Sequence, residues 1–231
     1  VAVIQARMGS SRFPGKIMKK INDKTVLENL FHQLTYSKLL GKKIIVTTKK
    51  NEDDILVEFT KLNNIDIFRG NEIDVLDRYY QCAKKNNIEN IVRITSDCPL
   101  IDPTIVDKVI EKYNLGNYDY VNNFSKIRCP SGFEVEIFSF ECLEKTWKNA
   151  KEDEREHVTQ YIYKNPNEFK IGSVSTINSF KKLHLSIDTK EDLKLIQIIY
   201  EKIESKPILL TEISKIIFSN PSMLTINNSI L

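Results

Sequence analysis

The sequence predicts an α/β protein in which a mainly parallel central sheet carries helices on both faces. Two observations carry this prediction. Short apolar runs alternate with amphipathic stretches of helical period from Val1 to Asn114, and this order is typical of parallel strands joined by crossover helices. No internal repeat and no linker rich in Pro, Gly or Ser divides the 231 residues. We therefore expect one domain at residues 1–219, followed by a loose polar tail at residues 220–231.

The elements of the first half are predicted from their own residues. Apolar runs bounded by polar or turn-forming residues predict strands at Val1–Ala6, Lys43–Thr48, Ile65–Phe68 and Asn90–Thr95. Apolar side chains that recur on one helical face predict helices at Thr25–Lys38, Glu52–Asn63, Ile73–Lys85 and Thr104–Tyr113. Asp102 is expected to cap the last of these helices, with Pro103 as its first residue.

The second half is less regular. Strands are predicted at Tyr118–Asn122, Gly132–Phe138, Phe169–Thr176 and His184–Ile187. Helices are predicted at Ser139–Asn149, Arg155–Tyr163, Thr189–Ile203 and Leu210–Phe218. One α/β domain with a less regular C-terminal half is the simplest interpretation of this order.

Composition and charge exclude several classes of protein. Apolar residues make up 41% of the chain and charged residues 28%, which is ordinary for a globular protein. The net charge is only +3, so nucleic acid is not an expected partner. No apolar run approaches the roughly 18 residues that a transmembrane helix needs, so no membrane partner is expected either.

The cysteine pattern predicts the cellular compartment. The chain has four Cys, and no pair has the Cys-x-x-Cys spacing, so we expect reduced thiols and no metal site built on Cys. Together with the lack of a visible signal peptide, this predicts a cytoplasmic protein. The chain opens at Val1 in what looks like a strand in progress, so we expect a short N-terminal piece with the initiator Met to precede it.

A basic loop after the first predicted strand is the first candidate for ligand binding. It runs from Arg7 to Lys16, contains Arg12 as a third cation, and holds two of the seven Gly. Small residues expose backbone N–H groups, and Arg and Lys add charge, so such a loop can wrap a triphosphate. Its pattern matches neither the Walker loop nor the dinucleotide fingerprint. A solvated basic turn is the alternative.

Two aspartates are candidate metal ligands because ligands bind at the C-terminal ends of parallel strands. Asp97 follows the predicted strand Asn90–Thr95, where a carboxylate can hold Mg²⁺ against phosphate oxygens. A turn aspartate that bonds its own backbone is the alternative. For Asp188, spacing alone favours a structural role at a helix start. His184 is interpreted as a packed strand residue.

Three weaker candidates also have ordinary explanations. Arg69 and Asn71 end the third predicted strand and could line a nucleotide pocket, although a turn before a charged helix explains them nearly as well. Glu134 and Glu136 share one face of a predicted strand and could contact a substrate or face solvent. His157 lies in a charged helix start, where a solvated face is the default interpretation.

Five sequence blocks resemble, in the same order, the sugar nucleotidyltransferases, and in particular their cytidylyltransferase group. The blocks are VIQARMGSSRFPGK, IFRGNEIDVLDRYYQCAKK, RITSDCPLIDP, EREHVTQYIY and LSIDTKEDL. The resemblance spans Val1 to Ile203 and includes the acylneuraminate and 3-deoxy-manno-octulosonate cytidylyltransferases and the spore-coat polysaccharide biosynthesis branch. It implies a Rossmann-like nucleotide-diphospho-sugar transferase fold.

The resemblance also implies an activity. The expected reaction is Mg²⁺-dependent transfer of a nucleotidyl group from a nucleoside triphosphate, expected to be CTP, to an acidic sugar or sugar-like acceptor. Pyrophosphate would be released, and the product would serve surface polysaccharide or glycan synthesis. The same analogy leaves room for a homodimer.

Site residues follow from the resemblance by position. The implied catalytic residues are Arg12, Lys16 and Asp97. The implied nucleotide-binding residues are Ala6, Arg7, Gly9, Ser10, Arg12, Lys16, Arg69 and Asn71. The implied ligands of Mg²⁺ are Asp97 and Asp188, which raises Asp188 above its interpretation from spacing. Glu134 and Glu136 are expected to face the acceptor.

Two departures from the family pattern leave the acceptor open. Ser131 stands where an acidic residue is expected, and Ser96 stands where Gly is common before the metal aspartate. Two alternative functions also remain. A glycosyltransferase of related fold would place its metal through an Asp-x-Asp pair, but Asp119 is unpaired here. A nucleotide-binding protein without catalysis would keep the basic loop and lose the chemistry.

Overall fold

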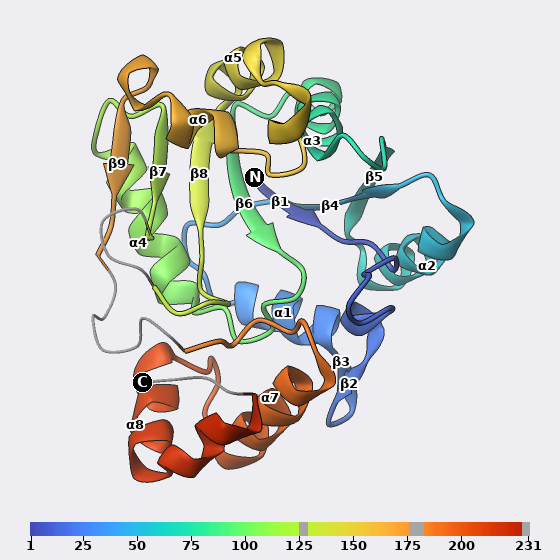
Figure 1. The fold of residues 1–231 in the computed structure, drawn as a ribbon, viewed down its shortest axis with the longest axis vertical. Coiled ribbons are helices and arrows are strands. Elements are labelled where there is room, and N and C mark those ends of the chain that lie inside the picture. The colour runs from blue at the N-terminus through green and yellow to red at the C-terminus, as the bar shows by residue number, and fades with distance from the viewer. Residues whose placement is uncertain (125–128, 176–182, 228–231) are drawn as a thin grey trace.

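The computed structural model describes residues 1–124, 129–175 and 183–227, and within them a seven-stranded sheet lies at the centre (Figure 1). Its order is β5-β4-β1-β6-β8-β7-β9. The strands are β1 (Ala2–Gln5), β4 (Lys43–Thr48), β5 (Asp66–Gly70), β6 (Asn90–Thr95), β7 (Tyr120–Asn122), β8 (Glu136–Ser139) and β9 (Ile171–Ser173). Every pairing is parallel except those of β8, which runs antiparallel to β6 and to β7. The predicted mainly parallel sheet is confirmed.

Helices cover both faces of the sheet, as predicted. One face is covered by α1 (Val26–Leu34), α2 (Asp54–Asn63) and α4 (Pro103–Asn114), and α7 (Lys190–Lys202) and α8 (Leu210–Ser219) join the apolar core on this side from beyond α1 (Figure 1). The other face packs against α3 (Val75–Lys85), α5 (Phe140–Asn149) and α6 (Gln160–Lys164). Side chains of a strand alternate between the two cores: in β1, Ala2 and Ile4 join the first and Val3 joins the second.

Local signals in the sequence place several of these helices. Thr25 and Glu28 form a reciprocal capping box at the start of α1. Asp102 caps α4, as predicted, because its carboxylate accepts the N–H of Thr104 at 2.8 Å while Pro103 occupies the first turn. The short hairpin β2 (Lys20–Ile21) and β3 (Lys24–Thr25) was not predicted, since each of its strands is too short to show a pattern.

Three predicted elements of the second half differ from the structure. The strand expected at Gly132–Phe138 begins only at Glu136, as β8. The expected strand at His184–Ile187 is reduced to one isolated bridge between Ser131 and His184. The expected helix at Arg155–Tyr163 begins at Gln160 instead. Arg155 is held outside the helix because its guanidinium donates to Asp74 Oδ2 at 2.6 Å and to the carbonyl of Trp147 at 2.8 Å.

The tail predicted to be loose from residue 220 is packed as far as Asn227. Pro221–Ile226 form a short 3-10 helix in which Met223 and Leu224 are buried. The Asn227 amide donates to the carbonyl of His184 and to Asp192 Oδ1, both at 2.9 Å. Buried apolar side chains and the Asn227 amide therefore anchor this segment to the rest of the fold. Residues 228–231 lie outside the described residues.

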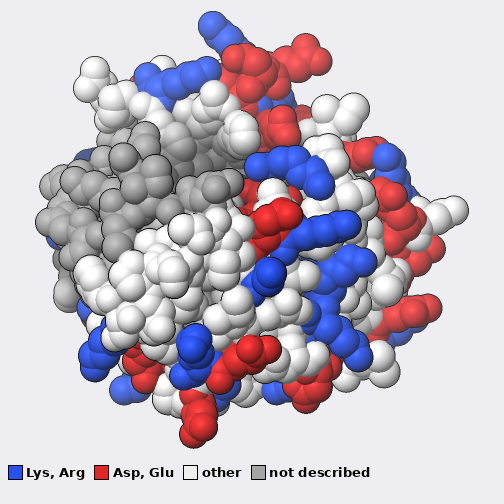
Figure 2. All heavy atoms as spheres, turned by 60° about the horizontal axis from the view of Figure 1, so that its bottom comes forward, with Lys and Arg blue, Asp and Glu red and all other residues white. Residues whose placement is uncertain are grey.

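Three features of the structure relate to the predicted compartment and partners: the state of the cysteines, the length of the helices and the charge on the surface. All four Cys are free and buried. In the described part of the chain, no helix is long and apolar enough to cross a membrane. On the face drawn in Figure 2, Lys and Arg side chains gather beside Asp and Glu side chains, so the charge is mixed on this face.

Candidate active site

The basic loop is fixed over the end of β1 by one buried carboxylate. Asp53 accepts the backbone N–H of Met8 at 2.7 Å and also bonds the hydroxyl of Thr48 at the end of β4. The loop closes where the N–H of Gly15 reaches the carbonyl of Met8 at 2.9 Å. Gly15 has φ +68°, a left-handed conformation that a residue with a side chain rarely adopts. The loop is therefore a built structure and not a loose basic turn.

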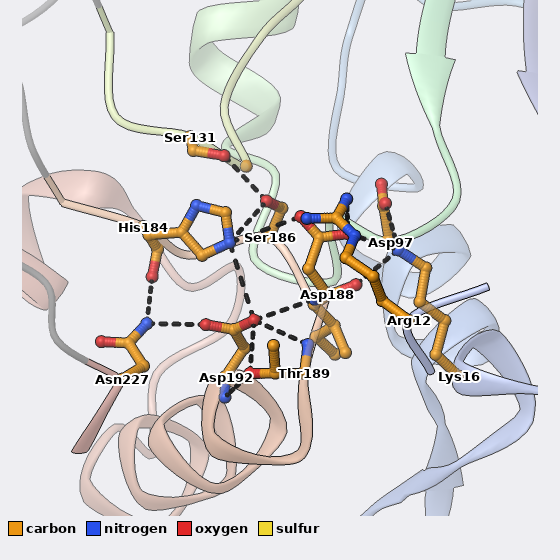
Figure 3. Close-up of polar contacts among 12 residues, drawn as sticks. Arg12, Lys16, Asp97, Ser131, His184, Ser186, Asp188, Thr189, Asp192 and Asn227 are labelled. Atoms are coloured by element: carbon orange, nitrogen blue, oxygen red, sulfur yellow. Dashed lines mark hydrogen bonds and ion pairs between the residues drawn. The ribbon is translucent and has the colours of Figure 1, made fainter. Parts of the chain in front are cut away.

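The loop brings its cations to the two distant aspartates (Figure 3). Lys16 Nζ lies 2.7 Å from Asp97 Oδ2, 3.0 Å from Asp188 Oδ1 and 2.6 Å from the carbonyl oxygen of Ile187. Arg12 Nη2 lies 2.9 Å from the same oxygen of Asp188. The four charged residues predicted to act together are thus in direct contact.

Asp188 reaches this cluster because it is not the cap of α7. The cap is Thr189, whose hydroxyl accepts the N–H of Asp192 at 3.2 Å. Asp192 in turn accepts the backbone N–H groups of Asp188 and Thr189 at 3.0 and 2.8 Å. These bonds fix the backbone of Asp188 and leave its carboxylate pointing toward Arg12 and Lys16 (Figure 3). Spacing alone allowed either Asp188 or Thr189 as the cap of this helix, and the cap is Thr189.

The cluster keeps its charges in a largely buried place. Burial disfavours charge on Lys16, but the nearby carboxylates of Asp97 and Asp188 outweigh it and raise the Lys16 pKa above its ordinary value. Burial also opposes ionisation of Asp97, but Lys16 outweighs it and lowers the Asp97 pKa. Both groups are therefore ionised at neutral pH.

A cavity of about 400 Å³, the loop cavity, opens in front of the basic loop. Its wall includes the predicted residues Ala6, Arg7, Ser10, Arg12, Lys16, Asp97 and Asp188. Arg78 from α3 and Arg93 from β6 add two cations that the sequence did not single out. Gly9 lies on the outer side of the loop, where an added Cβ would come within 2.7 Å of Glu52 Oε1. The loop cavity is thus lined by cations from three parts of the chain.

A second cavity of about 600 Å³ lies next to the loop cavity. Its own wall includes Phe124, Ser131, Glu134, Glu136, Gln160 and Tyr163. The two cavities share five lining residues, the shared wall, which are Arg93, Thr95, Asp97, His157 and Asp188. A molecule in one cavity can therefore meet a molecule in the other beside the two aspartates.

Glu134 and Glu136 both line the second cavity but differ in their surroundings. Glu136 opens β8 and is ion-paired with Arg93, while the hydroxyls of Tyr120 and Thr159 donate to it at 2.6 Å. Burial opposes its ionisation, but the charge of Arg93 and the hydroxyl hydrogen bonds together outweigh burial and lower the Glu136 pKa. Glu134 accepts the N–H of Gly132 at 2.7 Å, and burial raises its pKa. Contact of either residue with an acceptor stays a prediction.

Arg69 and Asn71 are not brought to the loop cavity. Arg69 donates to the carbonyls of Thr48 and Lys50 at 2.8 and 2.7 Å and pairs with Asp54 at 2.6 Å. Asn71 Oδ1 accepts two backbone N–H groups of the turn that follows it. Both residues line a hollow on the outer side of β5 and α3, and Asn71 also lines a hollow whose wall includes Arg7 of the loop cavity. The turn interpretation therefore accounts for Arg69 better than nucleotide binding.

Comparison with known proteins gives the family. The family model described as cytidylyltransferase matches residues 1–224. The chain belongs to the cytidylyltransferase family. The predicted family and the predicted enzyme class are confirmed by this match.

Relatives of this cytidylyltransferase cover nearly its whole length. An uncharacterized protein of Methanocaldococcus jannaschii is 39% identical and covers 100% of this chain and 95% of its own. The spore coat polysaccharide biosynthesis protein SpsF of Bacillus subtilis is 31% identical, with 96% and 95% covered. A solved cytidylyltransferase structure from Leptospira borgpetersenii is 35% identical, covers 100% and 97%, and has a TM-score of 0.92. The predicted Rossmann-like fold is thereby confirmed.

The protein oxygens at the site of this cytidylyltransferase are suited to a Mg²⁺ ion that is also bound by phosphate oxygens. Within the described residues, no cluster of three or more His, Cys, Asp or Glu could hold a metal. Two carboxylates, from Asp97 and Asp188, and the carbonyl of Ile187 converge on one point. Mg²⁺ is commonly bound by one or two carboxylates with phosphate oxygens completing its shell. The residues fit an ion that arrives with a nucleotide.

Sequence reasoning missed the parts of the wall that depend on tertiary structure. Arg78, Arg93 and His157 lie within three of the resembling blocks, but no role was assigned to them there. Arg78 is buried and donates to the carbonyl of Asn71 at 2.7 Å. No pattern in its own helix reveals this, because an Arg on an amphipathic helix is normally solvent-exposed.

Proposed function

We propose that this chain catalyses Mg²⁺-dependent transfer of a cytidylyl group from CTP to an acidic sugar or sugar-like acceptor, with release of pyrophosphate. The observation that carries the proposal is the meeting of Arg12, Lys16, Asp97 and Asp188 at the edge of the shared wall. Cations for a polyphosphate and carboxylates for its metal ion are needed together in such a reaction, and here they lie within hydrogen-bond distance of one another.

The loop cavity suits the triphosphate. Of the loop residues that line this cavity, Ser11 and Arg12 have backbone N–H groups with no hydrogen-bond partner in the described part of the chain. Unpaired N–H groups on a tight loop form an anion-binding concavity, and Arg and Lys strengthen it. CTP as the donor is supported by the cytidylyltransferase family itself.

The second cavity suits the acceptor because it joins the loop cavity at the shared wall. The acidic character of the acceptor is supported by the resemblance to the acylneuraminate and octulosonate enzymes. A role in surface polysaccharide or glycan synthesis is supported by the relative SpsF, whose name describes spore coat polysaccharide biosynthesis.

In this reaction the protein mainly positions the reactants and stabilises charge on the phosphates. An acceptor hydroxyl oxygen attacks the α-phosphorus, the bond to the pyrophosphate oxygen breaks, and the hydroxyl proton leaves to a base. We assign His157 as the base that accepts this proton, because its imidazole belongs to the shared wall. Mg²⁺, held by Asp97 and Asp188, would neutralise phosphate charge. Arg12 and Lys16 stabilise the negative charge that grows on the departing pyrophosphate.

Pyrophosphate release tests the proposal. The protein is incubated with each of the common nucleoside triphosphates, Mg²⁺ and a panel of acidic sugars. We expect release with CTP and one acceptor class, its loss when Mg²⁺ is chelated, and a fall of about 10² in rate for Asp97→Asn. Consumption of a nucleotide sugar without pyrophosphate would favour a glycosyltransferase. Tight CTP binding with no product from any acceptor would favour a binding protein.

A further inference from the structure

Lys16 occupies the point where the candidate metal ligands converge. Its ammonium group has three N–H donors, and three oxygens lie within 3.0 Å of it, from Asp97, Ile187 and Asp188. Its side chain is only 11% exposed. Carboxylates and a backbone carbonyl are also the ligands that a hard divalent cation prefers. Lys16 is thus held by the oxygens that would hold the metal.

The charges at this point already cancel. Asp97 and Asp188 carry two negative charges, and Lys16 and Arg12 carry two positive charges within ion-pair distance of them. A divalent cation that arrives alone must displace the Lys16 ammonium from its partners and leave that positive charge uncompensated at a largely buried place. Binding of free metal is therefore opposed.

A triphosphate removes this obstacle because it offers new anionic partners to the same cations. Lysine has a flexible stem and its ammonium can change partners without a change of the backbone. Arg12, whose side chain is 67% exposed, can turn toward the loop cavity in the same way. Once both cations face phosphate oxygens, the two carboxylates are left free to bind a divalent ion.

We propose that Lys16 is a placeholder for the metal ion, which closes the carboxylate pair to free divalent cations and opens it when a triphosphate binds. The inference rests on the proposed function and extends it, because it makes metal and nucleotide bind cooperatively through one side chain. Such coupling is reciprocal: the nucleotide strengthens metal binding by the same factor by which metal strengthens nucleotide binding.

Binding of Mn²⁺ alone, measured by the electron paramagnetic resonance signal of the free ion, tests the placeholder. We compare the wild type with Lys16→Met and with Lys16→Gln, which keeps polar contacts to both carboxylates but lacks the charge. Removing the ammonium is expected to tighten Mn²⁺ binding by about tenfold or more. Lys19→Met, at an exposed neighbour, is the matched control and should bind as the wild type does. Equal Mn²⁺ affinity in the wild type and both Lys16 variants would overturn the inference.

A second measurement needs only the wild type. Crystals of the wild type are exposed to Mn²⁺ alone and to Mn²⁺ with CTP, and the anomalous signal of Mn²⁺ locates the ion. We expect no ion between Asp97 and Asp188 without CTP, and an ion there with CTP while Lys16 contacts phosphate oxygens. An ion between the carboxylates in the absence of CTP would overturn the inference, as would Lys16 still bridging them with CTP bound.

The two proposals fail in different ways. The arms with Mn²⁺ alone involve neither CTP nor an acceptor, so they decide the placeholder even if CTP is not the substrate. Failure of CTP to bind or react in the wild type would count against the proposed function. In that case, tighter Mn²⁺ binding by the Lys16 variants would still support the placeholder role of Lys16.

Discussion

Lys16 and Asp188 lie 172 positions apart in the sequence, yet Nζ of one is 3.0 Å from Oδ1 of the other. The contact joins the first loop of the sheet to the segment that leads into α7. It exists because Thr189, and not Asp188, caps that helix. Thr189 is therefore a structural residue and its neighbour Asp188 is a candidate metal ligand. Substitutions at the two positions can measure these roles separately.

Substitution at these two neighbours should affect different properties. Asp188→Asn should reduce turnover by about 10², since it removes one charge that acts on the reacting phosphates, and should raise the Mg²⁺ concentration needed for activity. Thr189→Ala removes the cap and should instead destabilise the fold by about 1 kcal/mol. Steady-state kinetics and urea unfolding of both variants test this. A fully active Asp188→Asn enzyme would remove Asp188 from the proposed metal site.

The sequence led to the basic loop and Asp97 by general rules, but it led to Asp188 only by resemblance. Strand ends in a parallel sheet share one edge, so a loop after β1 and an aspartate after β6, which pairs with β1, must lie near each other. No such rule applies to Asp188, because the described residues 183–189 before α7 form no strand of the sheet and its spacing equally suits a helix cap.

The rest of the site depends on long-range contacts that local patterns do not contain. Glu136 and Arg93 meet because β8 inserts antiparallel beside β6, and strand order at long separation is not encoded in the strand's own residues. His157 reaches the shared wall because Arg155 is held by Asp74 and delays the start of α6. Helical propensity alone would extend that helix and carry His157 with it.

Acidification should act through the buried pair of Glu136 and Arg93. The folded-state pKa of Glu136 lies below its ordinary value of 4.5, so the stability it contributes is fully present above pH 4.5 and is lost as the pH falls below that value. Glu136→Gln leaves Arg93 without its charged partner and should cost about 3–5 kcal/mol at neutral pH. The difference from the wild type should shrink as the pH falls below 4.5.

Urea unfolding at a series of pH values measures this difference. Glu168→Gln is a suitable control because the Glu168 side chain is 42% exposed in its pair with Lys145. Its substitution should change stability by no more than about 1 kcal/mol. If the difference in unfolding free energy between the wild type and Glu136→Gln stayed constant down to pH 3, about 1.5 units below the ordinary pKa, an ionised pair of Glu136 and Arg93 would be contradicted.

Substitution of Arg69 should affect the stability of the fold, whereas substitution of Arg12 should affect the use of CTP. Arg69→Ala removes hydrogen bonds to two backbone carbonyls, each worth about 1 kcal/mol, and should lower the melting temperature with KM for CTP unchanged. Arg12→Ala should leave the melting temperature nearly unchanged, since its side chain is 67% exposed, and should reduce kcat/KM for CTP. A raised KM for CTP in Arg69→Ala would return Arg69 to the nucleotide site.

Substitution of His157 tests the assignment of the two cavities without a structure of a bound complex. His157 lines both the loop cavity and the second cavity, and its neighbour Glu156 lines the first but not the second. If His157 accepts the acceptor's proton, His157→Gln should lower kcat by about 10²–10⁴ and leave CTP binding, measured by calorimetry, unchanged. Glu156→Gln is the matched control and should keep kcat. Loss of CTP binding in His157→Gln would place the imidazole against the nucleotide instead, and the proton would then have to leave by way of another group of the shared wall.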